Sequence, residues 1–156
     1  MLVLQEGENQ LPWSEGSAQF ISEPYGRHNY FVGVRCQLGN QDVVEIAQLD
    51  TAAEWSVMSG DVAAALEPDL GEPLEEIVMY TRFGQSTGHL HRVRISLLAD
   101  EDFGDNVDVD GTILVIPDWP GPIMLGFRGF LDHLKVAIDP GADADAMPRI
   151  HFGSYA

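Results

Sequence analysis

One short segment of this chain has the residue types of a hydrolytic site. A mostly apolar segment, residues 43–49, leads into Asp50 and Thr51, and two small residues, Ala52 and Ala53, follow. A carboxylate at a strand end, on a turn of small residues, can approach a symmetry-related copy of itself. Two carboxylates about 3 Å apart cannot both ionise, so they share a proton and can activate a water while protonating a leaving group. The same residues also fit a plain turn in which Asp50 caps backbone N–H groups.

The surrounding residues resemble the active-site motif of the retropepsin family of aspartic proteases. In that family a hydrophobic strand leads into Asp-Thr-Gly-Ala, a hydroxyl residue, here Ser56, and an apolar pair. A second family landmark, an apolar pair and a Gly before an Arg and a short helix, is similar to residues 123–132. Between the landmarks, residues 83–88 stand where the family keeps its Gly-containing flap. The resemblance covers roughly residues 29–139.

The resemblance implies roles for the residues of both landmarks. Asp50 is the catalytic carboxylate, and the Thr51 hydroxyl bonds across a dimer axis to hold two active-site loops together. Ser56, Gly126 and Arg128 are expected to support the loop. Because the chain has a single Asp-Thr motif, a catalytic pair requires a homodimer with two-fold symmetry.

Further loop residues are expected to face the substrate. By the same resemblance, Ala52 and Ala53 form the floor of the cleft, and Trp55 forms a subsite beside it. Glu54 borders the substrate and is placed to pair with Arg128 beneath the site, where a bidentate ion pair would fix the loop.

The flap is expected to cover the bound peptide. Phe83, Gly84 and Gln85 contact the substrate from above, and the segment through Gly88 closes to exclude water, as lids do. Phe83 and Ile123 are plausible apolar wall residues of the subsites.

The sequence departs from the family pattern at two positions. Ala52 replaces the family's Gly; it is tolerated where φ is negative, and strained by about 1 kcal/mol where φ is positive. Phe127 separates Gly126 from Arg128, which could keep Arg128 away from Glu54.

These features favour an endopeptidase that hydrolyses peptide bonds without a cofactor or metal. One alternative is a catalytically silent member of the same fold that binds peptides or proteins. Another is an unrelated acidic β domain in which the motif is a chance turn. The chain ends, residues 2–4 and 150–152, are candidates for an intersubunit sheet.

The composition argues against nucleic acid and membranes as partners, but it does not identify the partner. The formal charge of −17, from 25 acidic and 8 basic residues, repels nucleic-acid phosphates and anionic membranes. With one cysteine, no apolar run of membrane-spanning length and no secretory leader pattern, we expect a cytoplasmic protein. Repulsion between two such chains predicts that salt or mild acid strengthens the dimer.

The fold expected is mostly β: a closed β-barrel of the acid protease type with one short C-terminal helix. Residues 1–28 are expected to be an extended arm with one short strand at 2–4, and residues 29–156 a single domain. Alternation and turn residues indicate a hairpin ending at Asp50. Helical spacing is seen at residues 130–135, and one helical turn is expected within 60–72.

Overall fold

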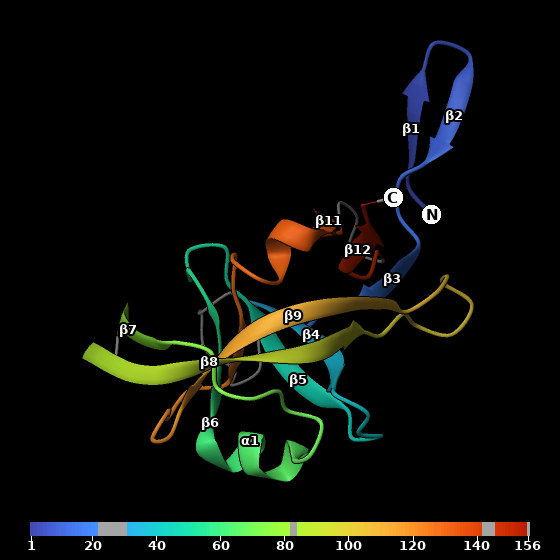
Figure 1. Cartoon of the computed structure of the whole chain (residues 1–156). Coiled ribbons are helices and arrows are strands. Elements are labelled where there is room, and N and C mark those ends of the chain that lie inside the picture. The colour runs from blue at the N-terminus through green and yellow to red at the C-terminus, as the bar shows by residue number, and fades with distance from the viewer. Residues whose placement is uncertain (22–30, 82–83, 142–145, 156) are drawn as a thin grey trace.

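The structure, a computed structural model, describes residues 1–21, 31–81, 84–141 and 146–155. These residues are mostly β and form three sheets of seven, three and two strands (Figure 1). Mostly β architecture was expected from the alternation of apolar and polar residues, and this expectation is confirmed. Among the described residues, no helix has the length and apolar character needed to cross a membrane.

The seven-stranded sheet carries the Asp50 segment. Its order is β4-β5-β10-β6-β9-β8-β7, and β4, the first strand in this order, also pairs with the C-terminal end of β8, from Cys36↔Leu97 to Leu38↔Ile95. The strands are β4 (Val32–Leu38), β5 (Glu45–Leu49), β6 (Ser56–Ser59), β7 (Glu76–Thr81), β8 (Gly84–Leu97), β9 (Val107–Ile116) and β10 (Ile123–Leu125).

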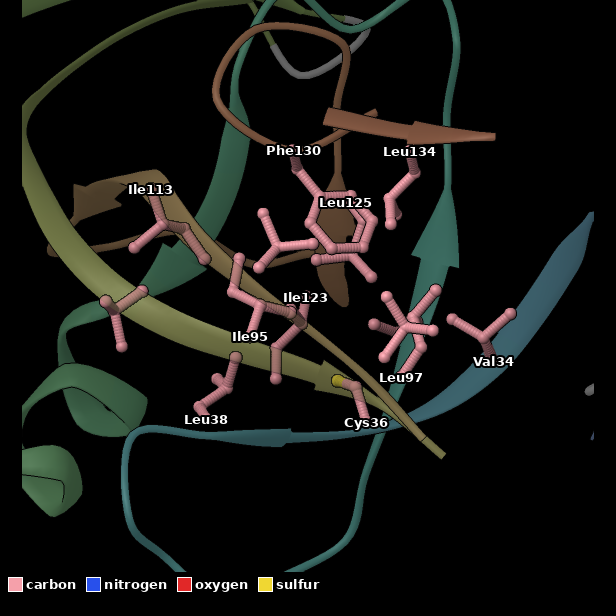
Figure 2. Close-up of a cluster of buried hydrophobic side chains, with 14 of the residues drawn as sticks. Val34, Cys36, Leu38, Ile95, Leu97, Ile113, Ile123, Leu125, Phe130 and Leu134 are labelled. Atoms are coloured by element: carbon pink, nitrogen blue, oxygen red, sulfur yellow. The ribbon is translucent and has the colours of Figure 1, made fainter. Parts of the chain in front are cut away.

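The core lies inside this sheet and beneath the chain that follows β10. Alternate residues of β9 point inward, among them the fully buried Ile113, and β8 contributes Ile95 and Leu97. Figure 2 shows these side chains gathered with Leu125 and Phe130 in one buried cluster. Burying each such side chain stabilises the fold by roughly 1.5–3 kcal/mol.

The three-stranded sheet joins the two ends of the chain. Its order is β11 (Leu134–Asp139), β12 (Arg149–Ser154), β3 (Gly16–Gln19), all antiparallel. The expectation that residues 1–28 form an arm is therefore wrong for β3, because its backbone pairs with β12. Residues 150–152 are also unsuited to an intersubunit sheet, since both edges of β12 are already paired.

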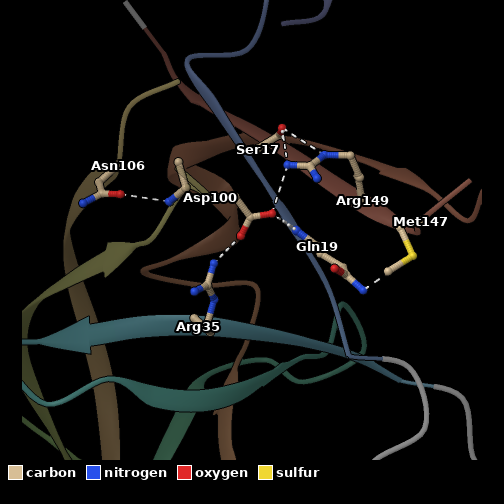
Figure 3. A network of polar contacts seen from close by, with 8 residues as sticks. Ser17, Gln19, Arg35, Asp100, Asn106, Met147 and Arg149 are labelled. Atoms are coloured by element: carbon tan, nitrogen blue, oxygen red, sulfur yellow. Dashed lines mark hydrogen bonds and ion pairs between the residues drawn. The ribbon is translucent and has the colours of Figure 1, made fainter. Parts of the chain in front are cut away.

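Asp100 connects this sheet to the larger one. Its carboxylate forms ion pairs with Arg35 of β4 and with Arg149 of β12, the latter at 3.1 Å, and accepts the Gln19 N–H at 2.8 Å (Figure 3). Arg149 also donates to the Ser17 hydroxyl. One side chain thus holds β3, β4 and β12 together.

Of the two short helical segments that were expected, one is a helix and the other is only a turn. Helix α1 (Gly60–Leu66) follows Ser59, whose hydroxyl caps the Val62 N–H at 3.3 Å. The C-terminal helix expected at residues 130–135 is only a 3₁₀ turn, η1 (Leu131–His133). Helical spacing was misleading there, because residues from Leu134 onward are held by the β11–β12 ladder.

The first strands form a separate hairpin. β1 (Val3–Glu6) pairs with β2 (Asn9–Pro12), where a single strand at residues 2–4 was expected. Gly7 provides the positive φ of the turn, at 63°. Figure 1 shows the hairpin projecting away from the rest of the molecule.

Candidate functional site

Asp50 begins a tight loop at the end of β5. Its own N–H donates to the Leu125 carbonyl at 3.0 Å, and its Oδ1 accepts the Ala52 N–H at 2.9 Å. The Ala53 N–H closes the turn on the Asp50 carbonyl at 3.2 Å. These contacts orient the carboxylate while the next side chain, Thr51, remains exposed.

The strands on either side of this loop are separated by a third strand. β5 and β6 do not neighbour each other; β10 lies between them, parallel to β5 and antiparallel to β6. The chain leaving β10 then follows the loop: Phe127 N–H donates to Ala53 O at 2.9 Å, and Arg128 N–H to Glu54 O at 2.8 Å. The two segments that resemble retropepsin landmarks are thus adjacent, although about 75 residues lie between them.

Ser56 and Gly126 form the buried junction of these segments. The Ser56 hydroxyl, fully buried, accepts the Gly126 N–H at 2.9 Å. A Cβ at Gly126 would lie 2.4 Å from the Trp55 carbonyl oxygen, so only glycine allows this close approach. Both residues thus lie where structural support of the loop was expected.

The backbone at Ala52 accepts alanine. Among the described non-glycine residues, only Asp102 has a positive φ. The backbone at Ala52 therefore carries no left-handed strain, so alanine is tolerated here in place of the glycine of the retropepsin motif. Its methyl group faces the cavity described below.

Arg128 reaches Glu54 in spite of the intervening Phe127. A guanidinium nitrogen lies 3.5 Å from the Glu54 carboxylate, and the guanidinium carbon lies 5.7 Å from the centre of the Trp55 ring. Phe127 is accommodated by turning outward, where it is exposed. Trp55 packs under Arg128 and is not among the residues lining the cavity, so the expected subsite is not formed by this side chain.

A cavity of about 440 Å³ lies beside the Asp50 carboxylate. Ala52, Ala53 and Glu54 line it, and so does Trp119, whose indole N–H donates to Pro122 O at 2.7 Å. Trp119 takes the place that sequence reasoning gave to Trp55. The proline-rich stretch around it gave no periodicity from which its orientation could be read.

The β7–β8 hairpin covers one side of this cavity. Its two strands pair as far as Thr81↔Gly84, so the connection is shorter than the expected loop, and Gly84 and Gln85 belong to strand β8. The hairpin residues that line the cavity come from β7: Val78, Met79, Tyr80 and Thr81. Gly84 and Gln85 are exposed and are not among the residues that line it, and Phe83 lies outside the described residues.

A second, larger hollow lies on the opposite side of the same loop. This groove has a volume of about 1010 Å³ and is lined by Asp50 and Thr51 at one end and by Trp13 and Tyr155 at the other. Strand β11 forms one wall. Asp50 therefore borders both the covered cavity and an open groove.

The side chains that line the cavity beside Asp50 include those of the loop, of β7 and of Trp119. Burial raises the pKa of Cys36 to about 12, so this thiol is not a competent nucleophile. Among the described residues, no three His, Cys, Asp or Glu side chains gather as metal ligands would. Comparison of the chain with protein-family models and with curated proteins finds no match. What the chain does is therefore inferred from the residues around Asp50 and the two hollows they line.

Proposed function

We propose that this chain is a retropepsin-like aspartic endopeptidase that acts as a homodimer, with one Asp50 from each copy in the catalytic pair. The observation that carries the proposal is the position of Asp50, whose residue lines both the hairpin-covered cavity and the open groove. A substrate in the cavity and a second subunit in the groove would meet at this carboxylate.

The strand order supports a fold of the acid protease type. Six strands follow one another as β4-β5-β10-β6-β9-β8, and β8 pairs again with β4. Pairing of the sheet back onto its first strand is the arrangement that a closed barrel needs, and it supports this part of the proposal. Insertion of β10 between β5 and β6 places the Gly126 segment beside the Asp50 loop.

The chemistry follows from two carboxylates that share one proton. The ionised carboxylate takes a proton from a water whose oxygen attacks the peptide carbonyl carbon, and the protonated one donates to the carbonyl oxygen. Collapse of the tetrahedral intermediate breaks the C–N bond, and the amine leaves after protonation by the pair. No cofactor is needed for this sequence of steps.

The geometry of each copy supplies half of the site. Thr51 is exposed beside Asp50 and lines the groove but not the cavity. This position suits a hydrogen bond to Thr51 of the second copy across the two-fold axis. The β7 residues and Trp119 make the cavity largely apolar, which suits an apolar side chain of an extended peptide.

The test is cleavage of an unfolded protein mixture between about pH 4 and 7. We expect cleavage by the wild type and none by Asp50→Asn, while Asp108→Asn, which changes an exposed carboxylate on β9, stays active. Sedimentation in the same buffers reports the dimer. A stable dimer without cleavage would favour the silent peptide-binding alternative, and a monomer under every condition would exclude the dimeric mechanism.

A further inference from the structure

The β1–β2 hairpin has little support from its own chain. All eight of its strand residues are exposed, including Leu4 at 54% and Leu11 at 49%, which are cross-strand partners. An isolated two-stranded hairpin is marginally stable at best in water. Exposed leucines on such a hairpin indicate that a further surface covers them.

The base of the hairpin is nevertheless firmly attached. The Leu2 N–H donates to the buried Ser14 hydroxyl at 2.8 Å, and the Leu2 carbonyl accepts the Trp13 N–H at 2.9 Å. The next residue, Glu15, donates its N–H to Phe152 of β12 at 2.9 Å. The direction in which the hairpin projects is therefore fixed by the three-stranded sheet (Figure 1).

The groove beside Asp50 offers a surface of matching character. Phe127, Ile138 and Tyr155 line it, and each is more than half exposed. One wall is β11, the edge strand of its sheet, whose outer backbone groups have no strand partner among the described residues. Such an edge readily accepts another strand.

One local charge contact between the two surfaces would be favourable. The hairpin tip carries Glu6 and Glu8, and strand β11 carries Lys135, the single lysine of the sequence; the two carboxylates that line the groove, Asp50 and Asp132, come from other elements. In a chain with a net charge of −17, most pairs of surfaces repel each other. Attraction between this acidic tip and this lysine would favour self-association.

We propose that the two copies of the dimer exchange their hairpins, each β1–β2 hairpin lying along β11 in the partner's groove. Leu4 and Leu11 then pack on the apolar wall around Ile138, and the acidic tip lies toward Lys135. Figure 1 shows the hairpin projecting away from the rest of its own chain, so a second copy is the occupant that the geometry favours. This inference rests on the proposed dimer and adds the segment that holds it together.

The first test is a mixed disulfide between two full-length variants. Leu4→Cys and Ile138→Cys chains are mixed, allowed to exchange and oxidised; Cys36 is fully buried and does not interfere. We expect a heterodimeric disulfide in this mixture and none when Val43→Cys, an exposed valine before β5, replaces Leu4→Cys. An intramolecular disulfide in the Leu4→Cys/Ile138→Cys double variant, in place of an intermolecular one, would overturn the proposal.

The second test is dimer affinity by sedimentation. Leu4→Asp/Leu11→Asp is expected to raise the dimer Kd by at least about tenfold, and Val43→Asp/Val44→Asp to leave it within about twofold. Because all four residues are exposed, circular dichroism should show the same fold in both variants. Equal effects of both pairs on an otherwise intact dimer would refute hairpin exchange and leave the protease proposal standing. A wild type that never dimerises would refute both.

Discussion

The Arg128 guanidinium lies 3.5 Å from the Glu54 carboxylate, with both side chains more than half exposed. The pair forms because Arg128 N–H is already bound to Glu54 O, which aligns the two residues regardless of Phe127 between Gly126 and Arg128. An exposed ion pair of this kind contributes little to stability, about 0.2–1 kcal/mol. We expect the ion pair to act mainly by holding the Asp50 loop in position.

Arg128→Met should therefore separate stability from activity. We expect the free energy of unfolding to fall by less than about 1 kcal/mol, because the methionine still covers the Trp55 ring. Proteolytic kcat should fall while the substrate KM changes little, since the loop loses one of its anchors. Denaturant unfolding and steady-state kinetics measure the two effects, and Arg92→Met, on the exposed side of β8, is the control.

Ser56→Ala should destabilise the protein more than its small size suggests. The Gly126 N–H loses its buried acceptor, which costs about 1–3 kcal/mol. Chemical denaturation measures the loss, with Ser86→Ala on the hairpin strand β8 as a partly exposed control. A loss as small as that of the control would show that the buried hydrogen bond does not hold the loop.

Ala52→Gly should not raise proteolytic activity, although glycine is the residue of the retropepsin motif that this segment resembles. Since the Ala52 backbone has no positive φ, glycine relieves no strain and only adds freedom to the unfolded chain. We expect stability to fall by about 0.5–1 kcal/mol and kcat/KM not to rise. A large gain in activity would mean that the methyl group obstructs the cavity.

Asp100→Asn should loosen the contact between the two larger sheets. The carboxylate binds Arg35, Arg149 and the Gln19 N–H together, and an amide cannot accept from all three donors. We expect a loss of about 2–3 kcal/mol in the free energy of unfolding. Asp102→Asn, a nearby exposed carboxylate, is the control for net charge.

His151 makes stability depend on pH. Burial, with the N-terminal amino group and Arg149 nearby, lowers the pKa of this histidine below its ordinary 6.5, and its Nδ1 has no hydrogen-bond partner among the described residues. The unfolded chain therefore binds a proton more readily, so stability should decrease as the pH falls below 6.5 toward the folded-state pKa. His151→Gln should show a smaller decrease between about pH 7 and 5. Thermal melts over this range, with His133→Gln as an exposed control, would measure the difference.

Glu15 should add a second loss at lower pH. Hydrogen bonds from the Ser154 N–H and hydroxyl lower the pKa of Glu15 below 4.5. The ionised Glu15 therefore stabilises the folded chain above pH 4.5, and this stabilisation is lost as the pH falls through the folded-state pKa. An activity assay in acid should therefore include a folding control.

Local patterns in the sequence were sufficient for the elements near Asp50. Alternation identified the strand that ends at Asp50, and one helical turn was expected within residues 60–72, where α1 lies. The two segments singled out as landmarks are in contact in the structure. Spacing failed at residues 130–135, where apolar residues three and four apart fit both a helix and the observed turn leading into a strand. Local periodicity cannot separate those two, because the deciding hydrogen bonds come from β12.

The sequence by itself determined that the chain is mostly β and that Asp50 sits on a turn of small residues after an apolar strand. Only the tertiary structure decided that Trp119, in place of Trp55, faces the cavity, that Arg128 reaches Glu54, and that β3 pairs with β12. These facts depend on backbone pairing between segments far apart in the chain, and one-dimensional patterns carry no information about which distant strands will meet. The cavity and the groove that Asp50 borders depend on the position of β10 between β5 and β6, and this position is set by the pairing of strands across the whole sheet.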